Sequence, residues 1–77
     1  MKVKVLFFGV LAEKAGTDTA EIENVKDTEI LEDLILEKYP DFSKFSYRVS
    51  VNKTIVNGNE SLKDGDELAF MPPFAGG

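Results

Sequence analysis

The C-terminal stretch LKDGDELAFMPPFAGG, residues 62–77, fixes how this chain ends. Residues 63–66 are typical of a tight turn, and Glu67 to Met71 then alternates like a short strand, with Leu68 and Phe70 on one face. Pro72 and Pro73 cannot donate backbone hydrogen bonds, so the strand must stop before them. The stretch therefore predicts a final strand followed by a stiff, extended tail that finishes in two glycines.

Alternating apolar and polar residues upstream predict the rest of a sheet. Lys2 to Phe8 places its valines and Phe7 on a core face, and leaves Leu6 and Phe8 on the lysine face without an obvious partner. Further strands are predicted over residues 19–25, 48–52 and 54–56, with a tight hairpin turn at Asn52-Lys53. Residues 9–18 are predicted to be a connection with room for one helical turn.

Residues 26–39 form the one long helix that the sequence predicts. Asp27 or Thr28 can cap it by accepting hydrogen bonds from free backbone N–H groups, and Pro40 ends it. Its apolar stripe follows the three–four spacing of an amphipathic helix and is predicted to face the core. The stripe consists of Ile30, Leu31, Leu34 and Ile35, with Lys38 at its edge.

The order of these elements predicts the fold class. One helix can cover only one face of such a sheet, so the chain should form a two-layer α+β domain. Strand, strand, helix, strands and final strand is the order of a β-grasp (ubiquitin-like) fold, a mixed sheet with its first and last strands parallel at the centre. We divide the chain into a β-grasp domain, residues 1–71, and an extended C-terminal tail, residues 72–77.

Composition limits the chemistry that this domain can perform. With 77 residues and neither cysteine nor histidine, the chain has no thiolate nucleophile, imidazole base or soft-metal site, so we predict no metal and no independent active site. The net charge of −5 disfavours nucleic acid and favours a basic protein surface as partner. The absence of a signal peptide or a long apolar run predicts a cytoplasmic protein without membrane contact.

The tail carries the predicted function. Six residues from Pro72 onward could reach about 20 Å when fully extended. Gly76 and Gly77 lack side chains, so they can enter a narrow channel and leave the terminal carboxylate open to attack. An ATP-using partner could convert that carboxylate to an acyl-adenylate, which a sulphur or amine nucleophile can attack. The product would be a thiocarboxylate, a thioester or an isopeptide.

Several motifs together resemble one known family. Residues 5–9 (VLFFG) with 11–16 (LAEKAG), residues 51–54 (VNKT) and residues 62–70 (LKDGDELAF) are similar to the small subunit of molybdopterin synthase. The ending PPFAGG is similar to that family's diagnostic tail, and the likeness spans essentially the whole chain. These small subunits are ubiquitin-like sulphur carriers.

The resemblance implies a mechanism centred on Gly77. A ubiquitin-activating-type adenylyltransferase would adenylate Gly77 with Mg-ATP, and a sulphur-mobilising enzyme would supply the sulphur; the chain would bind no cofactor itself. The thiocarboxylated tail would then enter the large subunit of a heterotetramer and sulphurate cyclic pyranopterin monophosphate. The catalytic groups would belong to the large subunit, which makes this chain a sulphur-donor subunit of a sulphurtransferase.

The resemblance also implies which residues touch partners. The family's docking surface is an apolar patch of the sheet beside the tail, and the matching positions here are Phe8, Ile55 and Met71. The inserted segment would comprise Pro72, Pro73, Phe74, Ala75 and Gly76, with Phe74 as an anchor in the partner's channel.

Three other functions stay open on the sequence. The chain could be a protein modifier joined through Gly77 to target lysines, or a sulphur carrier for thiamine or transfer-RNA thiolation. It could also be an interaction module whose tail is inert. Replacing Gly77 by a bulky residue separates these classes, because every carrier should fail and an interaction module should not.

Overall fold

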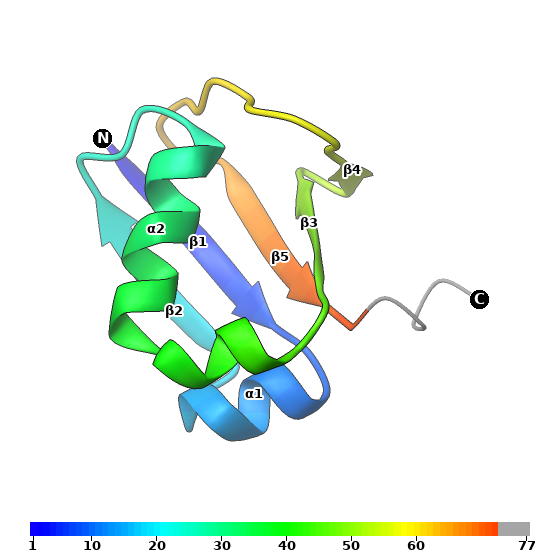
Figure 1. The fold of residues 1–77 in the computed structure, drawn as a ribbon. Helices are drawn as coiled ribbons and strands as arrows, with labels where there is room; N and C mark the ends of the chain where they lie inside the picture. The colour runs from blue at the N-terminus through cyan, green and yellow to red at the C-terminus, as the bar shows by residue number, and fades with distance from the viewer. Residues whose placement is uncertain (73–77) are drawn as a thin grey trace.

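The computed structural model describes residues 1–72, which form a five-stranded sheet with helices packed on one face (Figure 1). Strands run in the order β2-β1-β5-β3-β4 across the sheet. In chain order the elements are β1 (Lys2–Phe7), α1 (Val10–Ala15), β2 (Thr19–Glu23), α2 (Thr28–Lys38), the 3-10 helix η1 (Pro40–Lys44), β3 (Arg48–Val51), β4 (Thr54–Ile55) and β5 (Glu67–Met71).

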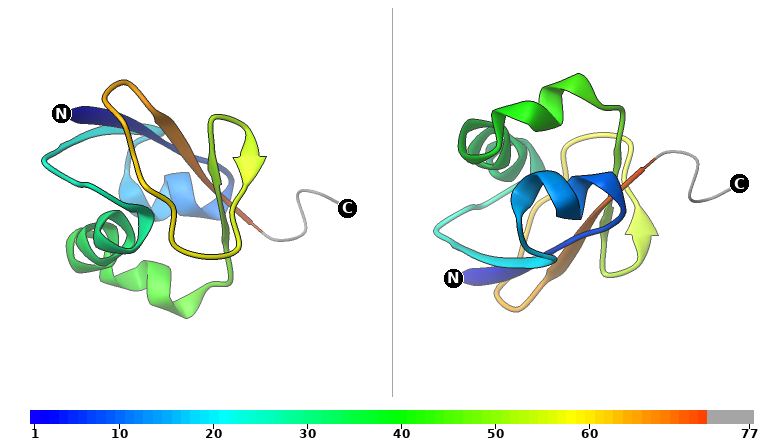
Figure 2. Two further views of the ribbon diagram at one scale, coloured as in Figure 1. Left: turned by 90° about the horizontal axis from the view of Figure 1, so that it is seen from above. Right: turned by 90° about the horizontal axis from the view of Figure 1, so that it is seen from below.

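The strand pairing is that of the predicted fold. β1 and β5 are parallel neighbours, with Val5 opposite Leu68 and Phe7 opposite Phe70, and each has an antiparallel strand on its other side. Seen from above and below, α2 and η1 lie to one side of the sheet (Figure 2). The predicted α+β β-grasp architecture is therefore confirmed.

The core lies between the sheet and α2. Alternation along β1 places Val3, Val5 and Phe7 in it, as predicted, and β5 adds Leu68 and Phe70. Aromatic rings close one end of this core. The ring centroid of Phe42 in η1 lies 5.5 Å from that of Phe7, in an edge-on arrangement. Phe42 is fully buried, so the segment after α2 closes this end of the core.

The predicted core stripe of the long helix is wrong for two residues. Leu31 and Ile35 are fully buried, but Ile30 is 36% and Leu34 is 41% exposed. The inward line of α2 runs through Thr28, Leu31 and Ile35, since Thr28 is itself buried. Loop residues 58–60 determine how α2 is rotated about its own axis. Thr28 Oγ1 donates to Asn59 Oδ1 at 3.1 Å and accepts from the backbone N–H of Glu60 at 3.0 Å.

Local chemistry sets the boundaries of the helices and of the hairpin. The Asp27 carboxylate caps α2 by accepting from the Ile30 N–H at 3.0 Å, so Asp27 is the cap. The predicted connection over residues 9–18 contains the six-residue helix α1, which ends at Gly16 with φ +74°. Asn52 (φ +49°) and Lys53 (φ +74°) form the predicted tight turn between β3 and β4. Within residues 1–72 every helix is too short or too polar to cross a bilayer.

Candidate functional site

The candidate site is a shallow hollow of about 270 Å³ on the face of the sheet opposite α2. Ser50 of β3 and Ala69 of β5 are paired, small and buried, so they form a low floor. Longer side chains from β1 and the residue after it, from the β3–β4 turn, and from β4 and β5 surround this floor. The lining residues are Leu6, Phe8, Ser50, Lys53, Ile55, Glu67, Ala69 and Met71.

All three residues predicted to bind a partner line this one hollow. Phe8 is 46% exposed, Ile55 is 40% exposed, and Met71 is half-buried. The fold brings them together because β5 lies between β1 and β3, and β4 extends the sheet beyond β3. That they bind a partner stays a prediction; that they share one exposed apolar surface is a structural finding.

Charged residues occupy the other end of the same face. Lys2 and Lys4 of β1 lie opposite Glu23 and Glu21 of β2, and the Lys2 Nζ atom is 3.7 Å from Glu21 Oε1. The apolar surface is therefore confined to the end of the sheet where β5 leads into Pro72. An exposed apolar patch with a charged border is typical of a protein interaction site.

Two charged residues at the edge of the hollow were not among the predicted site residues. Lys53 and Glu67 line it alongside the apolar side chains. Lys53 adopts φ +74°, a conformation that non-glycine residues rarely adopt. The sequence contained a signal for each, because Lys53 lies in the turn beside Ile55 and Glu67 shares a strand face with Met71.

A hydrogen-bond network holds this turn against β5. The Asn52 N–H donates to the Glu67 carbonyl at 2.7 Å, and Asn52 Oδ1 accepts from the Glu67 N–H at 3.0 Å. Asn52 Nδ2 also donates to Asp66 Oδ1 at 2.9 Å, and this bond, followed by one from the Lys63 N–H, lowers the pKa of the Asp66 carboxyl. The network therefore determines the positions of Lys53 and Ile55 relative to β5.

The first residue of the predicted tail lies against the domain. Pro72 is buried, and it follows directly after Met71 of the hollow. The remaining predicted tail residues, Pro73, Phe74, Ala75, Gly76 and Gly77, which is the predicted reactive residue, lie outside the described residues. The described part of the chain thus connects the apolar hollow to the start of the tail without an intervening loop.

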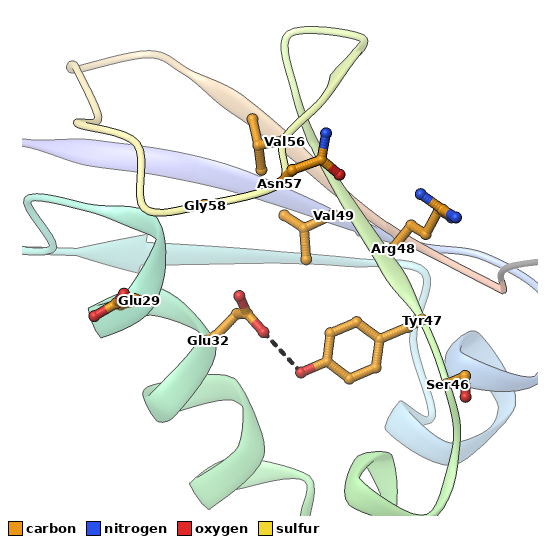
Figure 3. A pocket seen from close by; sticks show the side chains of 9 residues that line it. All are labelled: Glu29, Glu32, Ser46, Tyr47, Arg48, Val49, Val56, Asn57 and Gly58. Atoms are coloured by element: carbon orange, nitrogen blue, oxygen red, sulfur yellow. Dashed lines mark hydrogen bonds between the residues drawn. The ribbon is translucent and has the colours of Figure 1, made fainter.

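A second, more polar cleft of about 490 Å³ lies between α2, β3 and residues 56–58 (Figure 3). Tyr47 extends across it and donates its hydroxyl to Glu32 Oε2 at 2.9 Å, as the dashed line shows. Burial, then this bond, raises the pKa of Tyr47 far above its ordinary value of 10.0. The pair ties α2 to the start of β3. We found no cluster of metal-ligating side chains within residues 1–72.

Comparison with known proteins identifies the family. Residues 5–77 match the ThiS family, which is nearly the whole chain. This chain belongs to the ThiS family. The ThiS-family chain is 38% identical over 82 residues to the molybdopterin synthase sulfur carrier subunit of Mycobacterium tuberculosis, and the match covers 100% of this chain and 99% of the relative. The resemblance derived from the motifs is thereby confirmed.

This ThiS-family chain is similar to solved structures with two kinds of name. A putative molybdopterin converting factor subunit 1 from Pyrococcus furiosus has a TM-score of 0.83 and 30% identity, covering 95% of this chain and 98% of that chain. The small archaeal modifier protein 1 of Haloferax volcanii has a TM-score of 0.81 and 26% identity, covering 100% of both chains.

A third solved structure contains two subunits. It is the complex of subunits 1 and 2 of the molybdopterin-converting factor from Helicobacter pylori, with a TM-score of 0.72, 26% identity and 95% of each chain covered. In that protein the ThiS-like fold is therefore seen together with a second subunit.

Proposed function

We propose that this chain is the sulphur-carrier small subunit of a molybdopterin synthase, and that a thiocarboxylate on Gly77 donates sulphur to cyclic pyranopterin monophosphate. The observation that carries the proposal is the end-to-end match with sulfur carrier subunits of that synthase. The geometry supports it, because the exposed apolar hollow includes Met71, the residue directly before the tail.

The chemistry requires two activation steps at the terminal carboxylate. The Gly77 carboxylate attacks the α-phosphorus of Mg-ATP on an adenylyltransferase of the ubiquitin-activating type, and pyrophosphate leaves. A sulphide equivalent (HS⁻) released by a sulphur-mobilising enzyme then attacks the acyl carbon, AMP leaves as the C–S bond forms, and the product loses a proton. The resulting thiocarboxylate is a sulphur nucleophile, and two such transfers supply the two sulphurs of the dithiolene.

The large subunit is the proposed partner for the hollow. Phe8, Ile55 and Met71 would bury their exposed apolar surface against it, while Lys53 and Glu67 at the edge would fix the orientation of the complex. Residues 72–76 would then enter the partner's channel, with Phe74 as the anchor. A heterotetramer with a central dimer of large subunits places one small subunit at each end.

The charge distribution supports a basic partner. With 14 acidic and 9 basic residues, the chain would be attracted to a positively charged surface before docking. We propose a cytoplasmic location because the activating step consumes ATP.

The test is an intact mass of the chain purified from its own cells, with fragmentation of the C-terminal peptide. A species heavier by the exchange of one oxygen for one sulphur at Gly77 supports the carrier. The purified thiocarboxylate should then form molybdopterin when mixed with precursor and large subunit. A chain that ends at Gly76 is the matched control. Absence of the sulphur-containing species in cells that are making the cofactor would refute the proposal.

Protein modification is the second candidate, and the similarity to small archaeal modifier protein 1 favours it. In this case an amine of a target lysine attacks the activated Gly77, and AMP leaves as an isopeptide bond forms. Branched peptides that carry Gly77 on target lysines would identify this function in the same mass-spectrometric experiment.

A further inference from the structure

The turn after β1 contains a backbone conformation that only glycine adopts readily. Gly9 has φ +59° and ψ −134°, and the Leu11 N–H donates to the Phe8 carbonyl at 3.2 Å. These angles are those of the first central residue of a type II′ turn, a position that requires glycine. The turn begins at Phe8, so it starts from one edge of the docking hollow.

Pro72 lies directly against this glycine. A Cβ atom added to Gly9 would lie 3.0 Å from Pro72 Cγ and 3.7 Å from Pro72 Cδ. Gly16 (φ +74°) and Gly65 (φ +86°) also have positive φ, but a Cβ at either position would have nothing within 4 Å. Gly9 is thus distinguished from these two glycines by its close approach to the start of the tail.

Backbone pairing continues up to this contact. The Phe8 N–H donates to the Phe70 carbonyl at 3.1 Å, one step beyond the Phe7–Phe70 register of β1 and β5. Phe8 and Met71, both in the hollow, are the sequence neighbours of Gly9 and Pro72 respectively. The contact therefore links the docking surface to the direction in which the chain leaves β5.

We infer that Gly9 and Pro72 are positioning residues for the reaction at Gly77, because their contact sets the exit direction of the tail relative to the docked hollow. This inference rests on the proposed function. Because Gly9 has no Cβ, the proline ring can lie close to its backbone, and the ring's fixed φ limits the directions in which the chain can continue. A side chain at position 9 would both strain the turn and displace Pro72.

The contact itself is tested by thermal melts of four full-length chains: wild type, Gly9→Ala, Pro72→Ala and the double variant. Gly16→Ala and Gly65→Ala, each alone and with Pro72→Ala, are the controls, because they share the positive φ without the contact. Gly9→Ala should lower Tm more than either control. Adding Pro72→Ala should raise Tm again only in the Gly9→Ala background, because alanine lacks the Cγ atom that clashes with the new Cβ at position 9. If the Tm change of the double variant equals the sum of the Tm changes of Gly9→Ala and Pro72→Ala, the two residues are not in contact.

The positioning role is tested by steady-state adenylation of the same chains by the activating enzyme. Gly9→Ala should lower kcat roughly tenfold to a hundredfold and leave KM within about twofold, because the substitution misdirects the tail without removing any side chain from the exposed faces of the domain. Gly16→Ala should keep the wild-type kcat. If Gly9→Ala does not fold, Pro72→Ala alone should give the same loss of kcat. If Gly9→Ala folds and keeps the wild-type kcat, the inference is wrong, even where the Tm changes of Gly9→Ala and Pro72→Ala are not additive.

The two proposals can fail separately. If the wild-type chain is never adenylated, the proposed function fails, and with it the positioning role. The melts would still show whether Gly9 and Pro72 are in contact. If the wild type is adenylated and Gly9→Ala behaves like Gly16→Ala, the proposed function stands and only the positioning role is refuted.

Discussion

Replacing Phe8 by alanine should weaken binding to the large subunit without unfolding the domain. Phe8 is 46% exposed, and a phenylalanine presents roughly 200 Å² of surface, so docking can bury about 90 Å² of it. At about 25 cal/mol per Å², this burial contributes about 2 kcal/mol to binding. The dissociation constant of Phe8→Ala should therefore rise roughly thirtyfold.

Leu34→Ala provides a matched control for this measurement. Leu34 is 41% exposed, almost as much as Phe8, but it lies on the outer side of α2 rather than in the hollow. Both variants remove an exposed apolar side chain, so both should keep a cooperative melt. Only Phe8→Ala should lose affinity when each chain is titrated into the large subunit by calorimetry.

Two outcomes would refute the reasoning about the hollow. Equal affinities for Phe8→Ala and wild type would mean that the face opposite α2 is not the docking surface. An affinity loss in Leu34→Ala as large as that in Phe8→Ala would place the interface on α2, or would mean that both substitutions act through general destabilisation. The melts distinguish these last two explanations.

Two further predictions concern the ties between α2 and the rest of the domain. Asn59→Ala should lower the free energy of unfolding, measured in urea, by about 1–2 kcal/mol, because Asn59 Oδ1 accepts a hydrogen bond from the buried Thr28 hydroxyl. Asn57 is exposed, so Asn57→Ala is the control and should lower it by less than about 0.5 kcal/mol. Tyr47→Phe should cost about 1 kcal/mol at neutral pH through the lost bond to Glu32. The pKa of Tyr47 is raised in the folded state, so wild-type stability should fall as pH rises above the unfolded value of 10.0, and the variant should lack that part of the decline. A Tyr47→Phe stability curve parallel to wild type across this range would contradict the second prediction.

Alternation along the strands was sufficient to predict the sheet, because a strand puts every second side chain on the same face. It placed Val3, Val5 and Phe7 in the core, and it left Phe8 on the opposite face, where the hollow lies. The final strand was predicted with its correct bounds, Glu67–Met71, since a turn precedes it and a proline follows it.

Helix rotation could not be predicted in the same way. An apolar stripe through Ile30 and Leu34 is as regular as one through Leu31 and Ile35, and periodicity alone does not choose between them. The choice depends on Asn59, which is more than twenty residues beyond the helix and hydrogen-bonds the buried Thr28. A buried threonine at the first position of a helix gives no apolar signal, so the sequence indicates it only as a possible cap.

The site was predictable in its residues but not in its construction. Phe8, Ile55 and Met71 follow from strand faces and from the resemblance, whereas the small floor of Ser50 and Ala69 depends on their pairing between β3 and β5. The charged edge likewise depends on Asn52, whose three hydrogen bonds to residues 66 and 67 hold Lys53 in a left-handed conformation. Pairing across strands is long-range information that a local pattern does not contain.

These features together explain how so small a domain can present a reactive terminus. In the function proposed above, the chemistry depends on delivering Gly77 to groups on other proteins. Delivery requires that the docking surface and the tail keep a fixed relation. β1 and β5 provide it, because these parallel strands end side by side and contribute both Phe8 and Met71 to the hollow. The fixed relation continues to the first residue of the tail. The Phe8 N–H donates to the Phe70 carbonyl, and Pro72 packs against Gly9.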